Sequence, residues 1–153
     1  MKNTTKTLLI AASAILAIAG GALAGLGHDH TKVEAGPNGG RLITNVDPNA
    51  EFLVTSDRKV KITFVGGDGK VIAPAEQVVT VTTGDRSAPV KLIFTKSGDG
   101  LISDGVVPEG NGLPVIVQIK ASPDSKTEIT KFNLNLSNCP GCQKAEYACT
   151  CAH

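Results

Sequence analysis

The sequence predicts an all-β protein, an antiparallel β-sandwich of the immunoglobulin-like class that ends in a cysteine-rich tail. Three observations support this fold class. Short runs of β-branched and aromatic residues recur between positions 41 and 136. Clusters of Gly, Pro, Asp, Asn and Ser separate these runs at short intervals, as in antiparallel sandwiches and barrels. No segment shows the sustained periodicity and caps of a helix, which argues against nucleotide-binding folds built from βαβ units.

The strands follow from the alternation of apolar and polar residues along each run. The clearest run is residues 59–65, in which Val60, Ile62 and Phe64 share one face and mainly polar side chains occupy the other. Similar runs predict strands at residues 52–55, 78–82, 90–95, 115–119 and 129–136, with weaker candidates at 42–44 and 71–73. The intervening turns are expected at residues 46–49, 66–69, 84–87, 97–100, 108–112 and 122–125.

Composition argues against several function classes. The 15 Lys and Arg residues nearly balance the 14 Asp and Glu residues, so the chain carries a formal charge of +1, and only 3% of its residues are aromatic. A nearly neutral chain without Trp lacks the basic field and the stacking surfaces of a nucleic-acid-binding protein. All three His residues lie near the termini, and the aspartates of the middle region lie mostly in predicted turns, so we expect no enzyme activity.

The first 24 residues have the pattern of an export signal. Lys2 and Lys6 precede an apolar run from residue 8 to 24, and Ala22 and Ala24 are the small residues that a signal peptidase inspects. We expect cleavage after Ala24 and a periplasmic or secreted protein; the alternative is an uncleaved membrane anchor, which would be its membrane contact. The expected organisation is a signal peptide at 1–24, a flexible His- and Gly-containing segment at 25–40, a β-sandwich at 41–137 and a Cys-rich tail at 138–153.

All four cysteines lie within residues 139–151. Cys139 and Cys142 form a C-x-x-C pair around a Pro-Gly turn, which aims both sulfurs at one point. Cys149 and Cys151 form a C-x-C pair, whose side chains share one face of an extended chain, and His153 continues that face. Thiolate and imidazole are ligands that Zn²⁺ and Cu⁺ prefer, so these five residues predict a site for one of these metals.

Export leaves two further interpretations of the cysteines open. Thiols outside the cytosol are oxidised unless a metal or a reducing partner protects them. Two disulfides, each joining one member of the first pair to one of the second, would give a stapled structural or protein-interaction module without metal. The third interpretation is thiol–disulfide exchange through the C-x-x-C pair.

A second set of candidate ligands lies near the start of the mature chain. His28 and His30 flank an aspartate, and two imidazoles close to a free amino terminus can bind Cu²⁺ or Zn²⁺. This stretch and the Gly-Pro-Asn-Gly-Gly-Arg-Leu segment at 36–42 resemble the start of the periplasmic adaptor subunits of heavy-metal efflux pumps. The resemblance implies a β-domain from a metal-handling envelope system, with His28 and His30 as ligands.

These patterns together predict an exported envelope protein that binds Cu or Zn for sequestration or delivery. The expected partners are the metal ion and an envelope protein, without nucleic acid. The expected cofactor is a zinc or copper ion, and none under the disulfide interpretation.

Overall fold

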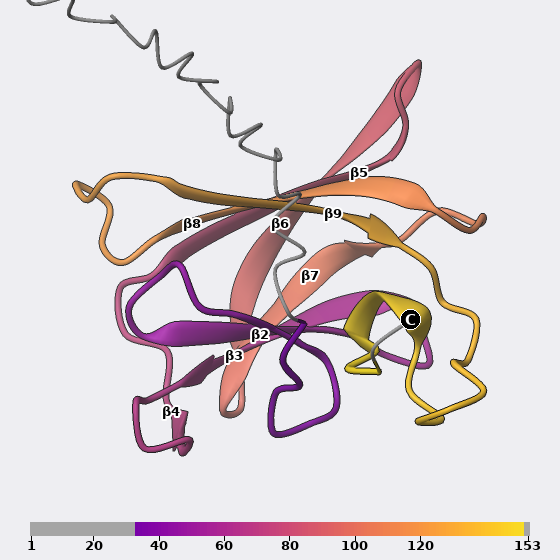
Figure 1. Cartoon of the computed structure of the whole chain (residues 1–153). Helices are drawn as coiled ribbons and strands as arrows, with labels where there is room; N and C mark the ends of the chain where they lie inside the picture. The colour runs from indigo at the N-terminus through magenta and orange to yellow at the C-terminus, as the bar shows by residue number, and fades with distance from the viewer. Residues whose placement is uncertain (1–32, 152–153) are drawn as a thin grey trace, which may run out of the picture. The chain divides into compact units, whose positions relative to one another are not determined.

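This computed structural model describes residues 33–151, which contain nine strands and one short 3₁₀ helix (Figure 1). The elements are β1 (Arg41–Ile43), β2 (Asn49–Val54), β3 (Lys59–Val65), β4 (Val71–Ile72), β5 (Val78–Asp85), β6 (Ala88–Ser97), β7 (Gly100–Val106), β8 (Leu113–Lys120), β9 (Glu128–Leu134) and η1 (Glu146–Ala148). Each of the eight runs predicted as strands overlaps one of these strands. The expected signal peptide, His28, His30 and His153 lie outside the described residues. Within residues 33–151, no helix has the length and apolar character needed to cross a membrane.

The strands form one antiparallel sheet that curls until it is nearly closed. Its order is β1-β2-β3-β7-β6-β5-β8-β9, and β4 pairs with β3 beside this path. β6 makes the corner, because residues 88–93 pair with β5 whereas residues 94–97 pair with β7. Figure 1 shows the two resulting layers, with β8 and β9 across from β2 and β3. The all-β, antiparallel, sandwich-like fold predicted from the sequence is therefore confirmed.

The two ends of the sheet meet through a side chain. Asn45, in the loop after β1, donates from Nδ2 to the carbonyl of Ile129 in β9 at 3.4 Å. Thr130 Oγ1 donates to Asn45 Oδ1 at 2.7 Å. These two bonds tie the loop after β1 to β9 and help to keep the sheet nearly closed.

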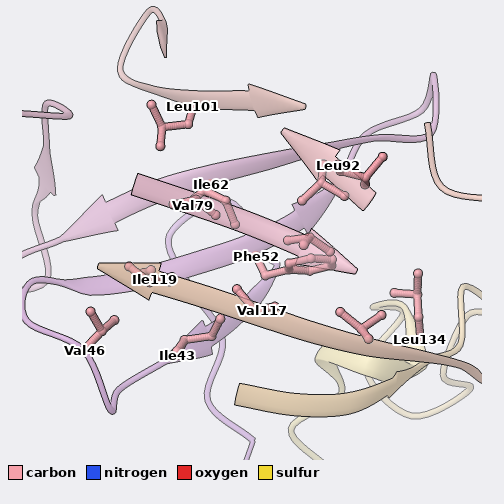
Figure 2. Packing of buried hydrophobic residues seen from close by; sticks show 14 of the residues in the cluster. Ile43, Val46, Phe52, Ile62, Val79, Leu92, Leu101, Val117, Ile119 and Leu134 are labelled. Carbon is pink, nitrogen blue, oxygen red and sulfur yellow. The ribbon is translucent and has the colours of Figure 1, made fainter. Parts of the chain in front are cut away.

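Alternation along the strands places one apolar face inside the curled sheet. Val115, Val117 and Ile119 of β8 are buried at every second position. They belong to the same buried cluster as Phe52 of β2 and Ile62 of β3, part of which is drawn in Figure 2. Burial of each such side chain stabilises the fold by about 1.5–3 kcal/mol.

β7 is the strand that the sequence analysis missed, because it contains Ser103, Asp104 and Gly105, which are residues typical of turns. In the structure, Ser103 bonds to β3, where the pairing of β7 with β3 is irregular, and Asp104 bonds to β6. Ser103 Oγ accepts from the N–H of Val60 at 2.9 Å, and the Asp104 carboxylate accepts from the N–H of Ile93 at 2.9 Å. A sequence typical of a turn therefore forms a strand whose side chains complete the backbone hydrogen bonding.

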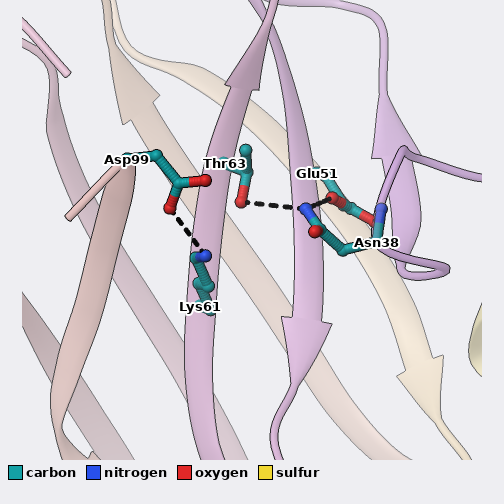
Figure 3. A network of polar contacts seen from close by, with 5 residues as sticks. All are labelled: Asn38, Glu51, Lys61, Thr63 and Asp99. Carbon is teal, nitrogen blue, oxygen red and sulfur yellow. Dashed lines mark hydrogen bonds and ion pairs between the residues drawn. The ribbon is translucent and has the colours of Figure 1, made fainter. Parts of the chain in front are cut away.

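The glycine-rich segment before β1 covers a buried carboxylate. Glu51 of β2 is fully buried, and its oxygens accept hydrogen bonds from Asn38 N at 2.9 Å and Asn38 Nδ2 at 2.7 Å (Figure 3). The N–H of Gly40 donates to the same carboxylate at 2.7 Å. A Cβ on Gly36 would lie 2.4 Å from the Glu51 side chain, so a larger residue does not fit there. In this fold the segment at 36–42 thus docks the start of the domain onto β2.

Candidate metal centre

A tight loop after β9 brings the first cysteine pair together. The N–H of Cys139 donates to the carbonyl of Lys144 at 2.7 Å, and the N–H of Gln143 donates to the carbonyl of Cys139 at 3.0 Å. Gln143 has a φ of 62°, a left-handed conformation that turns the chain sharply. The loop folds Cys142 back toward Cys139, as the Pro-Gly spacing predicts.

The helix η1 brings the second pair to the first. Tyr147 and Ala148 are 4% and 0% exposed, so η1 is part of the hydrophobic core. The N–H of Tyr147 donates to the carbonyl of Asn135, just after β9, at 3.2 Å. Cys149 follows directly, and its N–H donates to the carbonyl of Glu146 at 3.2 Å. The cysteine-rich segment up to residue 151 is therefore docked on the β-domain.

The four cysteine sulfurs converge on one point. Their Sγ atoms all lie within 4.8 Å of one another, and no disulfide joins any of these described cysteines. The Sγ–Sγ distances are 3.2 Å for Cys139–Cys149, 3.6 Å for Cys142–Cys149 and 3.9 Å for Cys139–Cys151. Four thiolates at about 2.3 Å from a tetrahedral Zn²⁺ would lie about 3.8 Å from one another. The cluster thus has the ligand number and spacing of a site for a single tetrahedral ion.

Two of the sulfur-bearing residues are buried and two reach solvent. Cys139 is 0% exposed and Cys149 is 7% exposed, whereas Cys142 and Cys151 are half-buried. Gly141 packs against the cluster, because a Cβ there would lie 3.1 Å from the Cys151 sulfur and 3.8 Å from the Cys139 sulfur. A bound ion would be enclosed on the side of Cys139 and Cys149 and accessible on the side of Cys142 and Cys151.

The thiols differ in their affinity for protons. The backbone N–H of Lys144 lowers the pKa of Cys142 to about 6, with help from the neighbouring thiols and against the effect of burial. The N–H of Cys151 lowers the pKa of Cys149, but the other thiols and burial outweigh it and raise this pKa to about 12. The Cys142 thiol raises the pKa of Cys151 above its ordinary value of 9.0. The Cys142 thiol therefore loses its proton more readily than the thiols of Cys149 and Cys151.

The residues that dock the cysteine-rich segment onto the β-domain were not predicted from the sequence. Tyr147 packs its ring against Phe52 and Phe132, and Arg41 places its guanidinium 4.8 Å from the centre of the Phe132 ring. Arg41 Nη1 also donates to the carbonyl of Tyr147 at 3.4 Å. The available signal was the one tyrosine of the chain, which lies in the spacer between the two cysteine pairs.

The structure brings together the four cysteines that the sequence predicted as ligands. His153, His28 and His30 lie outside the described residues, so their roles as ligands stay predictions. The chain matches no protein-family profile, and searches of curated proteins and of solved structures give no match. The resemblance to efflux-pump adaptors also stays a prediction.

Proposed function

We propose that this chain is an exported binding protein whose four cysteines hold one Zn²⁺ or Cu⁺ ion, for sequestration or delivery in the bacterial envelope. The observation that carries the proposal is the convergence of four sulfurs within 4.8 Å of one another. Soft thiolate ligands select these two ions over hard cations such as Mg²⁺ and Ca²⁺. The signal-like residues 1–24 support export.

The spacing of the sulfurs favours a single ion over a larger cofactor. An iron–sulfur cluster places several irons and sulfides between its thiolates. Four sulfurs that all lie within 4.8 Å of one another leave room for one ion and no more. Four Cys ligands around Zn²⁺ form a closed site, which suits tight holding of the ion, and the half-buried Cys142 and Cys151 give the route by which an ion would enter or leave.

Native mass spectrometry of protein purified from the envelope tests the proposal. We expect a mass that includes one metal ion and four reduced cysteines, and loss of the ion in the Cys139→Ser/Cys149→Ser variant. Serine keeps the size of these side chains but removes the soft ligand. A mass lower by four hydrogens, without metal, would contradict the proposal and indicate two disulfides.

A second function, a stapled structural or protein-interaction module, is favoured by one observation. Tyr147 and Ala148 lie in the core, so linking the two cysteine pairs would also lock η1 onto the domain. With disulfides as the staple, reduction should lower the melting temperature strongly, and chelators should have no effect. A protein whose melting temperature responds to chelators and not to reductants excludes this disulfide-stapled form.

A further inference from the structure

The only tyrosine of the chain lies between the two cysteine pairs and inside the hydrophobic core. Tyr147 is five residues after Cys142 and two residues before Cys149, and it is 4% exposed. Most residues of a short spacer between metal ligands have no reason to be buried. The burial of this large side chain indicates that the spacer is fixed to the β-domain.

Three contacts hold the Tyr147 ring. Its centroid lies 5.8 Å from that of Phe52 at an interplanar angle of 85°, and 6.3 Å from that of Phe132 at 16°. Its hydroxyl accepts a hydrogen bond from the N–H of Val54 at 3.0 Å. Phe52 and Val54 belong to β2 and Phe132 to β9, so the ring bridges strands from opposite ends of the sheet order.

The docked ring determines where the second cysteine pair lies. Cys149 is bonded through its N–H to Glu146, at the start of the same turn of η1, and its sulfur lies 3.2 Å from that of Cys139. With η1 undocked, the spacer residues before Cys149 would regain their conformational freedom. An incoming ion would then have to order them again, and this ordering would weaken its binding.

We propose that Tyr147 is a positioning residue that couples the metal site to the β-domain. The docked ring holds Cys149 and Cys151 against Cys139 and Cys142, and a bound ion in turn holds the ring against β2 and β9. The coupling is reciprocal because it is a free energy between two binding events. This inference rests on the proposed function, since it needs an ion at the four cysteines.

The coupling is tested by measuring the zinc affinity of four proteins. Wild type, Tyr147→Ala, Tyr147→Phe and Phe64→Leu are titrated in competition with a chromophoric chelator, under reductant. We expect Tyr147→Ala to bind Zn²⁺ about tenfold more weakly or worse, and Tyr147→Phe to stay near wild type because the ring contacts remain. Phe64→Leu is the matched control, because Phe64 is a fully buried aromatic residue of β3 that pairs with Ala50 and Ile72. It should lower the melting temperature and leave the zinc affinity unchanged.

Wild-type protein supplies a second readout that needs no variant. The chain has one Tyr and no Trp, so its tyrosine fluorescence and its near-ultraviolet circular dichroism in the tyrosine band come from Tyr147 alone. We expect both signals to change as Zn²⁺ is added to metal-free protein and to stop changing at one equivalent. Zinc binding that leaves both signals unchanged, or a folded Tyr147→Ala protein that binds Zn²⁺ as tightly as wild type, overturns the coupling alone. Absence of zinc and copper binding in wild type overturns the proposed function as well.

Discussion

Single residues decide whether the four sulfurs can share one ion. Gly141 lies between the two cysteines of the first pair, and a Cβ there would lie 3.1 Å from the Cys151 sulfur and 3.8 Å from the Cys139 sulfur. The N–H of Lys144 stabilises the thiolate form of Cys142, whereas the neighbouring thiols disfavour the thiolate form of Cys149. The site is therefore asymmetric in space and in proton affinity, and both properties can be tested by changing one residue or one condition.

Replacement of Gly141 should weaken metal binding. In Gly141→Ala the new methyl group would lie 3.1 Å from the Cys151 sulfur, so this sulfur must shift by a few tenths of an ångström away from its position. We expect about a threefold to thirtyfold loss of zinc affinity, measured by chelator competition. Gly67→Ala is the matched control, because a Cβ at Gly67 meets no atom within 4 Å. Equal affinity in the two variants would contradict the observed packing around the sulfurs.

Metal binding should release protons near neutral pH. The pKa of Cys142, about 6, leaves this thiol mostly ionised at pH 7, whereas the pKa of Cys149, about 12, and that of Cys151, above 9.0, keep both thiols protonated. An ion needs thiolates, so it must displace at least the two protons of Cys149 and Cys151. Calorimetric titration with Zn²⁺ in buffers of different ionisation enthalpy measures this number. A release below two protons per ion would contradict this prediction, because it would show that Cys149 or Cys151 is already ionised or does not bind the ion.

Tyr147 should give the protein a component of stability that disappears at alkaline pH. Burial raises the pKa of Tyr147 above its ordinary value of 10.0, against the hydrogen bond from Val54. The folded state thus holds the phenolic proton more tightly than the unfolded state. Its contribution is fully present below pH 10.0 and is lost as the pH rises through the folded pKa. The free energy of unfolding, measured with urea below and above this pH range, should fall more steeply with pH for wild type than for Tyr147→Phe. An equal fall in the two proteins would contradict the burial of the hydroxyl.

At the scale of elements, the domain depends on contacts that cross between segments. The glycine-rich segment is hydrogen-bonded to Glu51 of β2, and Tyr147 of η1 contacts Phe52 and Val54 of the same strand. Successive residues of one strand thereby fix both the start of the domain and the cysteine-bearing segment. β2 is the element whose disruption should affect the metal site and the fold together.

The Glu51→Gln substitution tests the first of these contacts. A glutamine of the same shape turns one acceptor oxygen into an NH₂ group, which faces the N–H donors of Asn38 and Gly40. Because the site is buried, we expect a loss of about 1–3 kcal/mol in the free energy of unfolding, measured by chemical denaturation. The exposed Glu109→Gln is the control and should cost little. A small effect at Glu51 would show that the segment at 36–40 is not held by the carboxylate.

The sequence was most informative where alternation and turn chemistry agreed. The run at 59–65 matches β3 at both ends, because Val60, Ile62 and Phe64 face the core and a glycine-rich turn follows. β7 could not be predicted, because its Ser103 and Asp104 make hydrogen bonds to other strands that only the fold brings near. Likewise, spacing indicated the four cysteines, but the role of Tyr147 depends on its contacts with β2 and β9.

At the scale of the whole molecule, the candidate site is built from one short stretch of chain and supported by a distant one. All four cysteines lie in residues 139–151, while the ring that positions the second pair contacts β2, about ninety residues earlier. Folding of the β-domain therefore provides the surface on which the cysteine-bearing segment docks. An ion that binds only the folded domain should stabilise it in proportion to the logarithm of its concentration.

X-ray absorption spectroscopy of the metal-loaded protein tests the central claim most directly, because it reports the atoms around the ion. With Zn²⁺ bound, we predict a shell of four sulfurs at about 2.3 Å, and with Cu⁺ a shell made of sulfur alone. The Cys142→Ser variant should show one sulfur fewer. A first shell dominated by nitrogen or oxygen in the wild-type protein would contradict the assignment of Cys139, Cys142, Cys149 and Cys151 as the metal site.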